Sequence, residues 1–140
     1  MKKIIVLLLV MVGWGCSTKQ ERGQEEKPPE LVSEVVTPQE FKAKIEGIPD
    51  AVLLDVRTAE EMAEGYIEGA VNIEFGQPDF EAGISGLDKE ATYLVYCAAG
   101  KRSGKTAKLM RDLQFKKVYD LEGGFNAWQA QGFPFVKDQP

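Results

Sequence analysis

A single cysteine followed by small and basic residues is the feature of this 140-residue chain best suited to chemistry. Cys97 comes directly after the apolar run 92–96 and begins the segment Cys97-Ala98-Ala99-Gly100-Lys101-Arg102-Ser103. Small side chains let the backbone curl tightly, so that successive N–H groups can point at one spot. A helix is expected to begin near Ser103, and its N-terminus would add positive potential at the same place.

These surroundings predict an ionised, nucleophilic thiol at Cys97. Backbone dipoles and the charges of Lys101 and Arg102 favour the thiolate, and such settings can lower a cysteine pKa to about 3.5–7.5. The alternative is an inert structural cysteine in the core. A core cysteine would gain nothing from a glycine and two cations beside it, so the nucleophile is the favoured interpretation.

The chain contains no histidine, and this restricts the chemistry further. Cys–His catalysis, an imidazole general base and His-ligated zinc are all excluded. Thiolate, backbone dipoles, carboxylates, Lys and Arg are the groups that remain. We therefore predict no metal site and no cofactor.

Length and composition fit one globular domain of ordinary type, with 44% hydrophobic and 28% charged residues. The formal net charge is −5, and a mature chain without residues 1–15 would carry 15 basic and 22 acidic residues, a balance of −7. Apart from Lys101, Arg102 and Lys105, the basic residues alternate with acidic ones. This pattern argues against a nucleic-acid partner.

The first 15 residues have the pattern of a secretory signal peptide. Lys2 and Lys3 precede nine apolar residues at 4–12, and Gly15 ends the segment. A helix needs about 20 apolar residues to cross a bilayer, so a permanent membrane span is not expected.

Cys16 follows Gly15 directly, and this arrangement resembles a bacterial lipoprotein signal. The resemblance implies that Cys16 is lipidated and anchors the protein to a membrane on the periplasmic side of the cell envelope. Secretion to the periplasm without a lipid is the alternative. Residues 17–30 contain no apolar side chain, so the segment 16–30 is expected to be a flexible linker.

A folded domain is expected over residues 31–137, where strand and helix patterns take turns. This alternation predicts an α/β domain with a largely parallel sheet. Strands are predicted at 34–36, 51–55, 71–73, 92–96 and 117–120. Helices are predicted at 38–46, 59–64, 79–87, 103–114 and 125–130.

Five motifs together resemble the rhodanese family of sulfurtransferases. They lie, in the family's order, at residues 53–57, 64–73, 97–103, 121–128 and 132–134. The resemblance implies a central, mostly parallel sheet of about five strands, with the cysteine loop at the sheet's C-terminal edge. It also implies that Cys97 carries a sulfane sulfur as a persulfide.

The resemblance further implies a role for each residue around the cysteine. Backbone N–H groups from Ala98 to Ser103 would stabilise the thiolate and the persulfide, while Lys101 and Arg102 would attract an anionic donor such as thiosulfate. Asp55 and Arg57 would brace the loop rather than take part in catalysis. The acceptor would be cyanide, a small thiol or a protein thiol.

Two other classes of function stay open. Cysteine-dependent phosphatases and arsenate reductases share this topology, but those phosphatases place five residues between Cys and Arg, whereas four separate Cys97 from Arg102 here. A shorter loop suits a sulfur atom better than a phosphoester. The third class is a persulfide carrier or partner-binding domain without small-molecule turnover. The sequence does not identify the physiological donor and acceptor, the membrane or the oligomeric state.

Overall fold

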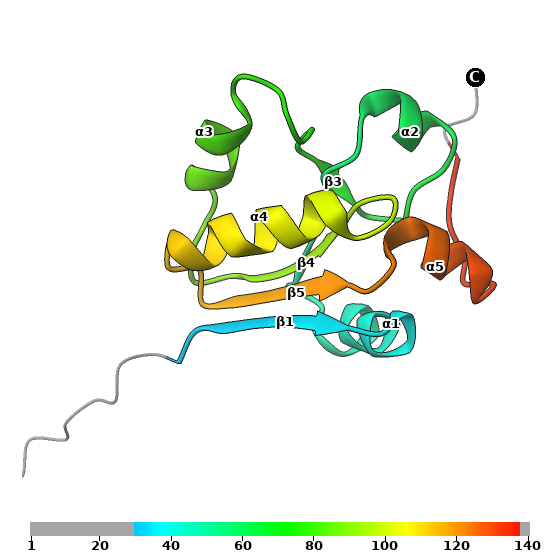
Figure 1. Ribbon diagram of the computed structural model, residues 1–140. Helices are drawn as coiled ribbons and strands as arrows, with labels where there is room; N and C mark the ends of the chain where they lie inside the picture. Colours follow the sequence, from blue (N-terminus) through cyan, green and yellow to red (C-terminus); the bar gives the residue numbers. More distant parts are fainter. Residues whose placement is uncertain (1–29, 138–140) are drawn as a thin grey trace, which may run out of the picture.

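The computed structural model describes residues 30–137, which form one five-stranded parallel sheet with helices on both faces (Figure 1). The strand order is β1-β5-β4-β2-β3, and each neighbouring pair is parallel. The predicted α/β fold with a central parallel sheet is confirmed. The strands are β1 Val32–Val36, β2 Val52–Asp55, β3 Val71–Asn72, β4 Thr92–Tyr96 and β5 Lys117–Leu121.

Local sequence signals explain where several helices start. Thr37 and Thr58 each form a capping box with the glutamate three residues later, Glu40 and Glu61, so both helices begin where the side chains satisfy free backbone N–H groups. The helices are α1 Pro38–Gly47, α2 Ala59–Ala63, α3 Phe80–Ser85, α4 Lys101–Asp112 and α5 Gly124–Ala130. Within residues 30–137 no helix is long and apolar enough to cross a membrane.

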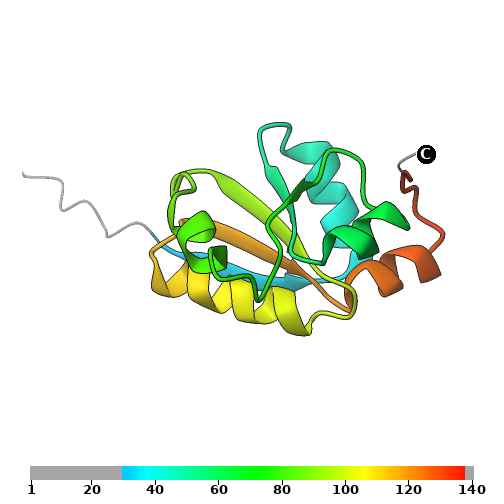
Figure 2. The same ribbon diagram turned by 90° about the horizontal axis from the view of Figure 1, so that it is seen from above.

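Two hydrophobic cores lie on the two faces of the sheet. Figure 2 shows α4 and α1 on opposite sides of the sheet. One joins the sheet to α3 and α4, and the other joins it to α1 and α5. Side chains of β4 alternate between them: Tyr93 and Val95 belong to the first core, and Leu94 and Tyr96 to the second. Cys97 continues the alternation into the α4 core.

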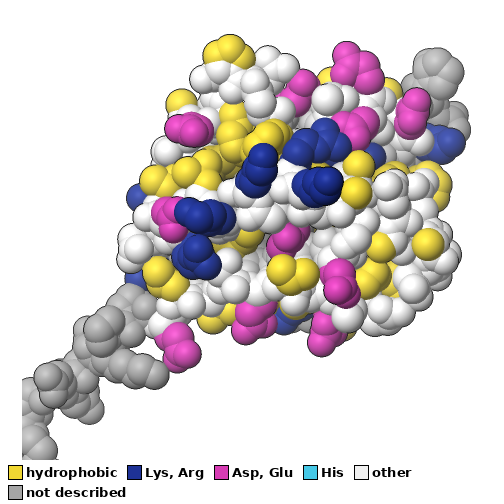
Figure 3. Space-filling model, in the orientation of Figure 1, with side chains coloured by type: hydrophobic (Ala, Val, Ile, Leu, Met, Phe, Trp, Pro, Cys, Tyr) yellow, Lys and Arg dark blue, Asp and Glu magenta, His cyan; other side chains and the backbone are white. Residues whose placement is uncertain are grey.

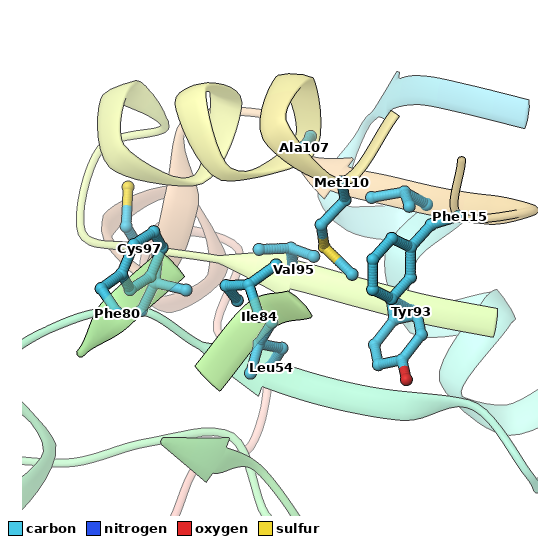
Figure 4. Close-up of a cluster of buried hydrophobic side chains, with 11 residues drawn as sticks. Leu54, Phe80, Ile84, Tyr93, Val95, Cys97, Ala107, Met110 and Phe115 are labelled. Atoms are coloured by element: carbon cyan, nitrogen blue, oxygen red, sulfur yellow. The ribbon is translucent and has the colours of Figure 1, made fainter. Parts of the chain in front are cut away.

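The alternation therefore decides where the sulfur lies. Figure 4 shows the Cys97 side chain at the end of β4, with its sulfur directed at the first turn of α4 and Phe80 beside it. The core around it is tight: Val95 and Met110 are fully buried, and each such side chain contributes about 1.5–3 kcal/mol to folding. Cys97 thus lies at the end of a strand that is buried on this face of the sheet.

One predicted boundary is wrong in a way that matters for the site. Helix α4 begins at Lys101, two residues before the predicted start at Ser103. The reason is Gly100, whose φ of +95° turns the chain directly into the helix. Lys101 and Arg102 therefore occupy the first helical turn rather than the loop.

Three predictions lie outside the described residues: the signal peptide at residues 1–15, the lipidation of Cys16, and the linker before residue 30. They stay predictions. Within the described residues the first strand is β1 and the last helix is α5, and the domain limits of 31 and 137 stay predictions.

Candidate active site

Cys97 lies at the C-terminal end of β4 with its sulfur inside a ring of donors. Its Sγ accepts a hydrogen bond from the Gly100 N–H at 3.1 Å and lies 3.4 Å from the Ser103 hydroxyl oxygen. The residue is 1% exposed. Burial raises the pKa of the thiol, but the hydroxyl of Ser103 and the amides of Ser103, Ala99 and Gly100 outweigh it, so the net pKa is lowered.

The start of α4 explains why amides are available to the sulfur. The first backbone bond of the helix runs from the Gly104 N–H to the Gly100 carbonyl at 3.0 Å, so the N–H groups before Gly104 have no partner within the helix. One of these belongs to Ser103, which is fully buried. The helix terminus and the loop therefore form one anion cradle around Sγ.

The N-terminus of α5 holds the same loop from outside. The N–H groups of Phe125 and Asn126 donate to the carbonyls of Cys97 and Ala98 at 2.7 and 3.0 Å. This contact requires a glycine at position 124, where a Cβ would lie 2.4 Å from the Cys97 carbonyl oxygen. Gly124 also has a φ of +61°, which other residues rarely adopt. The loop is thus fixed by two helix termini.

Asp55 and Arg57 form a buried ion pair. The guanidinium donates to the carboxylate from Nη2 at 2.7 Å and from Nε at 3.1 Å, and the Arg57 N–H donates to the same carboxylate at 2.9 Å. Arg57 also donates to the Gly65 carbonyl at 2.8 Å. Its contact with the α5 terminus runs through Phe125, whose ring centre is 4.2 Å from the guanidinium carbon. Any bracing of the cysteine loop by this pair is therefore indirect.

The two cations of the motif have different surroundings. Both terminal nitrogens of Arg102 bind the carboxylate of Glu61 at 2.7 Å, and this bond lowers the pKa of Glu61 to about 2. Much of the charge of Arg102 is thus neutralised, whereas Lys101 is exposed. Figure 3 shows Lys and Arg side chains along α4, with acidic groups beyond them.

A hollow lies next to the loop. It is lined by Ala98 of the loop, Phe125 and Asn126 of α5, and Arg57 and Glu61. Its lining is largely polar, with Glu64 and Gln129 beside these residues, and suits a polar group more than an apolar ligand.

The structure brings together the predicted loop residues and adds three that sequence reasoning missed. The sequence indicates Gly124 only as part of a turn. Two consecutive glycines, Gly123 and Gly124, are the only sign that another backbone segment packs closely here. Nothing in the sequence singles out Glu61, because a glutamate at the third helical position has an ordinary role in capping.

Asp120 is the third missed residue. It lies in β5, is 4% exposed, and has one carboxylate oxygen, Oδ1, with no hydrogen-bond partner. Burial raises its pKa to about 6, and the nearby Ser103 hydroxyl offsets only part of this rise. An acidic residue in a strand expected to be buried is the available signal.

The parallel sheet and the cysteine loop at its C-terminal edge define an open α/β fold with its candidate site at the carboxyl ends of the strands. Residues 37–131 match the family model described as a rhodanese-like domain. The match covers more than half of the chain, and the protein belongs to this family.

Several known proteins are similar over this domain. The putative sulfurtransferase YtwF of Bacillus subtilis is 39% identical over 94 residues, which cover 67% of this chain and 88% of YtwF. Thiosulfate sulfurtransferase 16 of Arabidopsis thaliana is 34% identical over 95 residues, 58% of this chain and 76% of that protein. A tRNA uridine(34) hydroxylase of Nitrobacter winogradskyi is 37% identical over 108 residues, 74% of this chain but only 42% of the hydroxylase.

Among solved structures, a rhodanese-related protein from Thermoplasma volcanium matches with a TM-score of 0.66 and 26% identity. The match covers 74% of this chain and 97% of that one. Family membership and the sulfurtransferase names of relatives together support sulfurtransferase chemistry at the level of the family.

Proposed function

We propose that this protein moves a sulfane sulfur from an anionic donor such as thiosulfate to a thiophilic acceptor, through a persulfide on Cys97. The observation that carries the proposal is the surroundings of Sγ, which faces the Gly100 N–H at 3.1 Å and the Ser103 hydroxyl at 3.4 Å. Such a cradle stabilises negative charge on one sulfur atom and, after transfer, on a second.

In the first step the thiolate attacks the outer sulfur of thiosulfate. A bond forms between that sulfur and Sγ, the donor's S–S bond breaks, and sulfite leaves with the bonding electron pair. No proton moves in this step, so the lack of histidine is no obstacle. The amides of Ala99, Gly100 and Ser103, which lower the thiol pKa, also hold the persulfide anion.

In the second step an acceptor attacks the terminal sulfur of the persulfide. With cyanide the product is thiocyanate, and with a thiolate it is a new persulfide; in both cases the Cys97 thiolate returns. The acceptor approaches through the hollow next to Ala98. Rigid support of the loop by the α5 N–H groups keeps Sγ aligned through both steps.

The test is mass spectrometry of the intact protein after incubation with thiosulfate. The expected result is a gain of one sulfur atom, which cyanide removes with release of thiocyanate. The Cys97→Ser variant is the matched control and gains no sulfur. A wild-type protein that gains no sulfur, although its thiol reacts with an alkylating reagent, contradicts the proposal.

A persulfide carrier is the second candidate, favoured by the pairing of Arg102 with Glu61. This pairing weakens the attraction for a small dianion and leaves Lys101 as the less compensated cation. A carrier would accept sulfur slowly from thiosulfate and rapidly from a protein persulfide. Comparing the two loading rates on the same sample distinguishes an enzyme from a carrier.

Phosphatase activity is the competing chemistry, and an aryl phosphate tests it. Phosphate release that depends on Cys97, without sulfur transfer, would replace the proposed function. Four residues between Cys97 and Arg102, with Gly100 already in contact with Sγ, leave little room for a tetrahedral phosphoester in the loop.

We also propose that the domain works at the bacterial cell envelope, held by a lipid on Cys16. The apolar run 4–12 and the polar segment 17–30 support this. Wild-type protein is expected to partition into the detergent phase of a cell extract, and Cys16→Ser to stay in the aqueous phase. A Cys16→Ser protein that partitions like wild type would contradict lipid anchoring.

A further inference from the structure

Helix α4 is strongly cationic in a protein that is acidic as a whole. Its residues Lys101–Asp112 include five lysines and arginines and one acidic residue, whereas the chain has a formal net charge of −5. Figure 3 shows Lys and Arg side chains gathered along the exposed face of this helix. A cationic face therefore starts four residues after Cys97.

The placement of these charges works against the helix itself. A helix N-terminus has positive potential, so acidic side chains are favoured in the first turn and cations in the last. Helices α1, α2 and α3 follow this preference with Glu40, Glu60 and Glu81 in their first turns. Helix α4 has no acidic residue there and begins with Lys101 and Arg102. Its charges thus serve something outside the helix.

A small anionic donor accounts for only part of this row of cations. Lys101 lies next to the cysteine loop, whereas Lys105 and Lys108 lie one and two turns further along the same face. At 1.5 Å per residue, Lys108 is about 10 Å from Lys101 along the helix axis. The row is longer than a thiosulfate ion and suits an extended acidic surface.

Lys101 and Lys105 carry charges that the described part of the chain does not balance. Both side chains are exposed, and neither forms an ion pair within residues 30–137. Their neighbours in the row differ, because Arg102 and Lys108 each bind a carboxylate of this chain. The two unpaired charges are available to a partner.

A partly apolar hollow lies beside the row, between α4 and the start of α3; we call it the α3–α4 hollow. Phe75, Phe80 and Leu109 line it together with Lys105, and Glu81 is the acidic residue of its lining. Phe80 also packs next to Cys97 in the core (Figure 4). An apolar pocket with charged residues around it is a common composition of protein–protein interfaces.

We propose that the exposed face of α4, together with the α3–α4 hollow, docks an acidic protein whose cysteine accepts the sulfur from Cys97. Carboxylates of the partner bind Lys101 and Lys105, and an apolar side chain enters the hollow. The inference rests on the proposed function and names its acceptor as a protein thiol. The partner's thiolate attacks the terminal sulfur of the persulfide; a new S–S bond forms, the old one breaks, and the Cys97 thiolate leaves with the electron pair.

The test compares two synthetic acceptor peptides on the full-length protein loaded with sulfur from thiosulfate. Both contain one cysteine and one leucine; one peptide carries several glutamates, and the other carries glutamines at the same positions. Mass spectrometry follows the sulfur that each peptide gains. Wild-type protein is expected to transfer sulfur about tenfold faster to the glutamate peptide at low salt, and added salt should bring the ratio of the two rates towards one.

Lys105→Glu is the decisive variant, because it reverses an unpaired charge and an acidic residue near the start of a helix favours folding. The ratio of the two rates is expected to fall about fivefold. Lys89→Glu is the matched control: Lys89 is also exposed, but its carbonyl binds the Lys116 N–H at the opposite edge of the sheet from Cys97. An unchanged ratio in Lys105→Glu, or an equal fall in both variants, overturns the proposal.

A second measurement needs neither sulfur nor a variant. The glutamate peptide with serine in place of its cysteine is added to isotope-labelled wild-type protein, and NMR follows the amide signals. The shifted signals are expected on α4 and around the α3–α4 hollow. Shifts confined to other elements, or no shifts, overturn the docking surface. Binding at α4 by a protein that forms no persulfide would contradict the proposed function and leave the docking surface intact.

A lipid surface is the other acidic partner that the experiment must separate. Vesicles of phosphatidylcholine and phosphatidylglycerol are offered to the full-length wild type and to Lys105→Glu, and equal binding is expected. If Lys105→Glu loses vesicle binding as strongly as it loses its preference for the glutamate peptide, the cationic face of α4 serves a membrane and the proposal fails.

Discussion

Asp55 and Asp120 are both buried carboxyl groups near the C-terminal ends of central strands, but their surroundings differ completely. Asp55 is fully buried, and both its oxygens accept hydrogen bonds from Arg57. Asp120 has a hydroxyl neighbour, no cation and one oxygen without a partner. The comparison teaches that burial alone does not define a role: a satisfied carboxylate holds the fold together, and an unsatisfied one retains capacity for a proton.

The two regions also differ in how they meet the cysteine loop. The Asp55–Arg57 pair reaches it indirectly, because Arg57 stacks on Phe125 and the Phe125 N–H binds the Cys97 carbonyl. Asp120 packs instead beside the first turn of α4, where its Oδ2 would lie 3.5 Å from a Cβ at position 104. Changes at the first region should therefore alter stability most, and changes at the second should alter the pH dependence of stability most.

The largest effect is expected for Arg57→Leu. This change leaves the Asp55 carboxylate buried without its cation, and the free energy of unfolding should fall by about 3–5 kcal/mol. Chemical denaturation measures the loss. Lys108→Met, which removes an exposed pairing with Asp112, should leave the denaturation midpoint almost unchanged. Equal losses of unfolding free energy in both variants would show that the buried Asp55–Arg57 pair stabilises the fold no more than an exposed pair does.

The second largest effect is expected for Gly124→Ala. The free energy of unfolding should fall by about 2–3 kcal/mol, and little persulfide should form. The new Cβ would collide with the Cys97 carbonyl at 2.4 Å and would also disfavour the φ of +61°. Gly132→Ala is the matched control, since Gly132 has a φ of +70° but no atom lies within 4 Å of the place its Cβ would take. Denaturation and persulfide mass are measured on both. Retention of full persulfide formation in Gly124→Ala would contradict a role for this contact in shaping the loop.

The pH dependence of stability separates Asp120 from Glu61. The unfolded Asp120 carboxyl loses its proton near 3.8 and the folded one near 6, so the native state binds more protons between these values. Stability should therefore fall as pH rises through this window, by about 3 kcal/mol. For Glu61 the folded pKa of about 2 lies below the usual 4.5, so its contribution is present above 4.5 and is lost as pH falls towards 2.

Denaturation at a series of pH values checks both windows. Asp120→Asn should remove the fall between about 4 and 6, and Glu61→Gln should remove the loss at lower pH. If Asp120→Asn keeps the wild-type slope in the upper window, Asp120 is not the group that titrates there.

The smallest effect is expected for Glu61→Gln, in the KM for the donor thiosulfate. Glutamine keeps the capping hydrogen bond with Thr58 but frees the charge of Arg102, so the KM for thiosulfate should fall about threefold at low salt. Glu60→Gln, an exposed neighbour on α2, gives the same change in net charge and should have less effect. Steady-state kinetics measure both variants, and equal KM values in the two would point to net charge instead of the Arg102 pairing.

Much of the fold is predictable because its signals are local. The apolar run 92–96 is β4, the Thr37 and Thr58 caps begin α1 and α2, and Ala107 and Met110 of α4 face the core as their spacing indicates. The sequence predicts the start of α4 two residues too late. Lys101 could belong to the loop or to the helix, and only the left-handed φ of Gly100 in the structure shows that the helix begins directly after it. Roles for the loop residues remain predictions to be tested by the substitutions above.

The sequence by itself determined that a cysteine, a tight small-residue turn and two cations follow one another, because covalent order makes them neighbours in any fold. It also determined the α/β architecture, through periodicity and capping. Only the tertiary structure decided that Gly124 lies against the loop, that Glu61 neutralises Arg102, and that Asp120 is buried beside Gly104 of α4. These partners are far apart in the chain, and their contacts arise from the parallel strand register and helix packing, which no local pattern encodes.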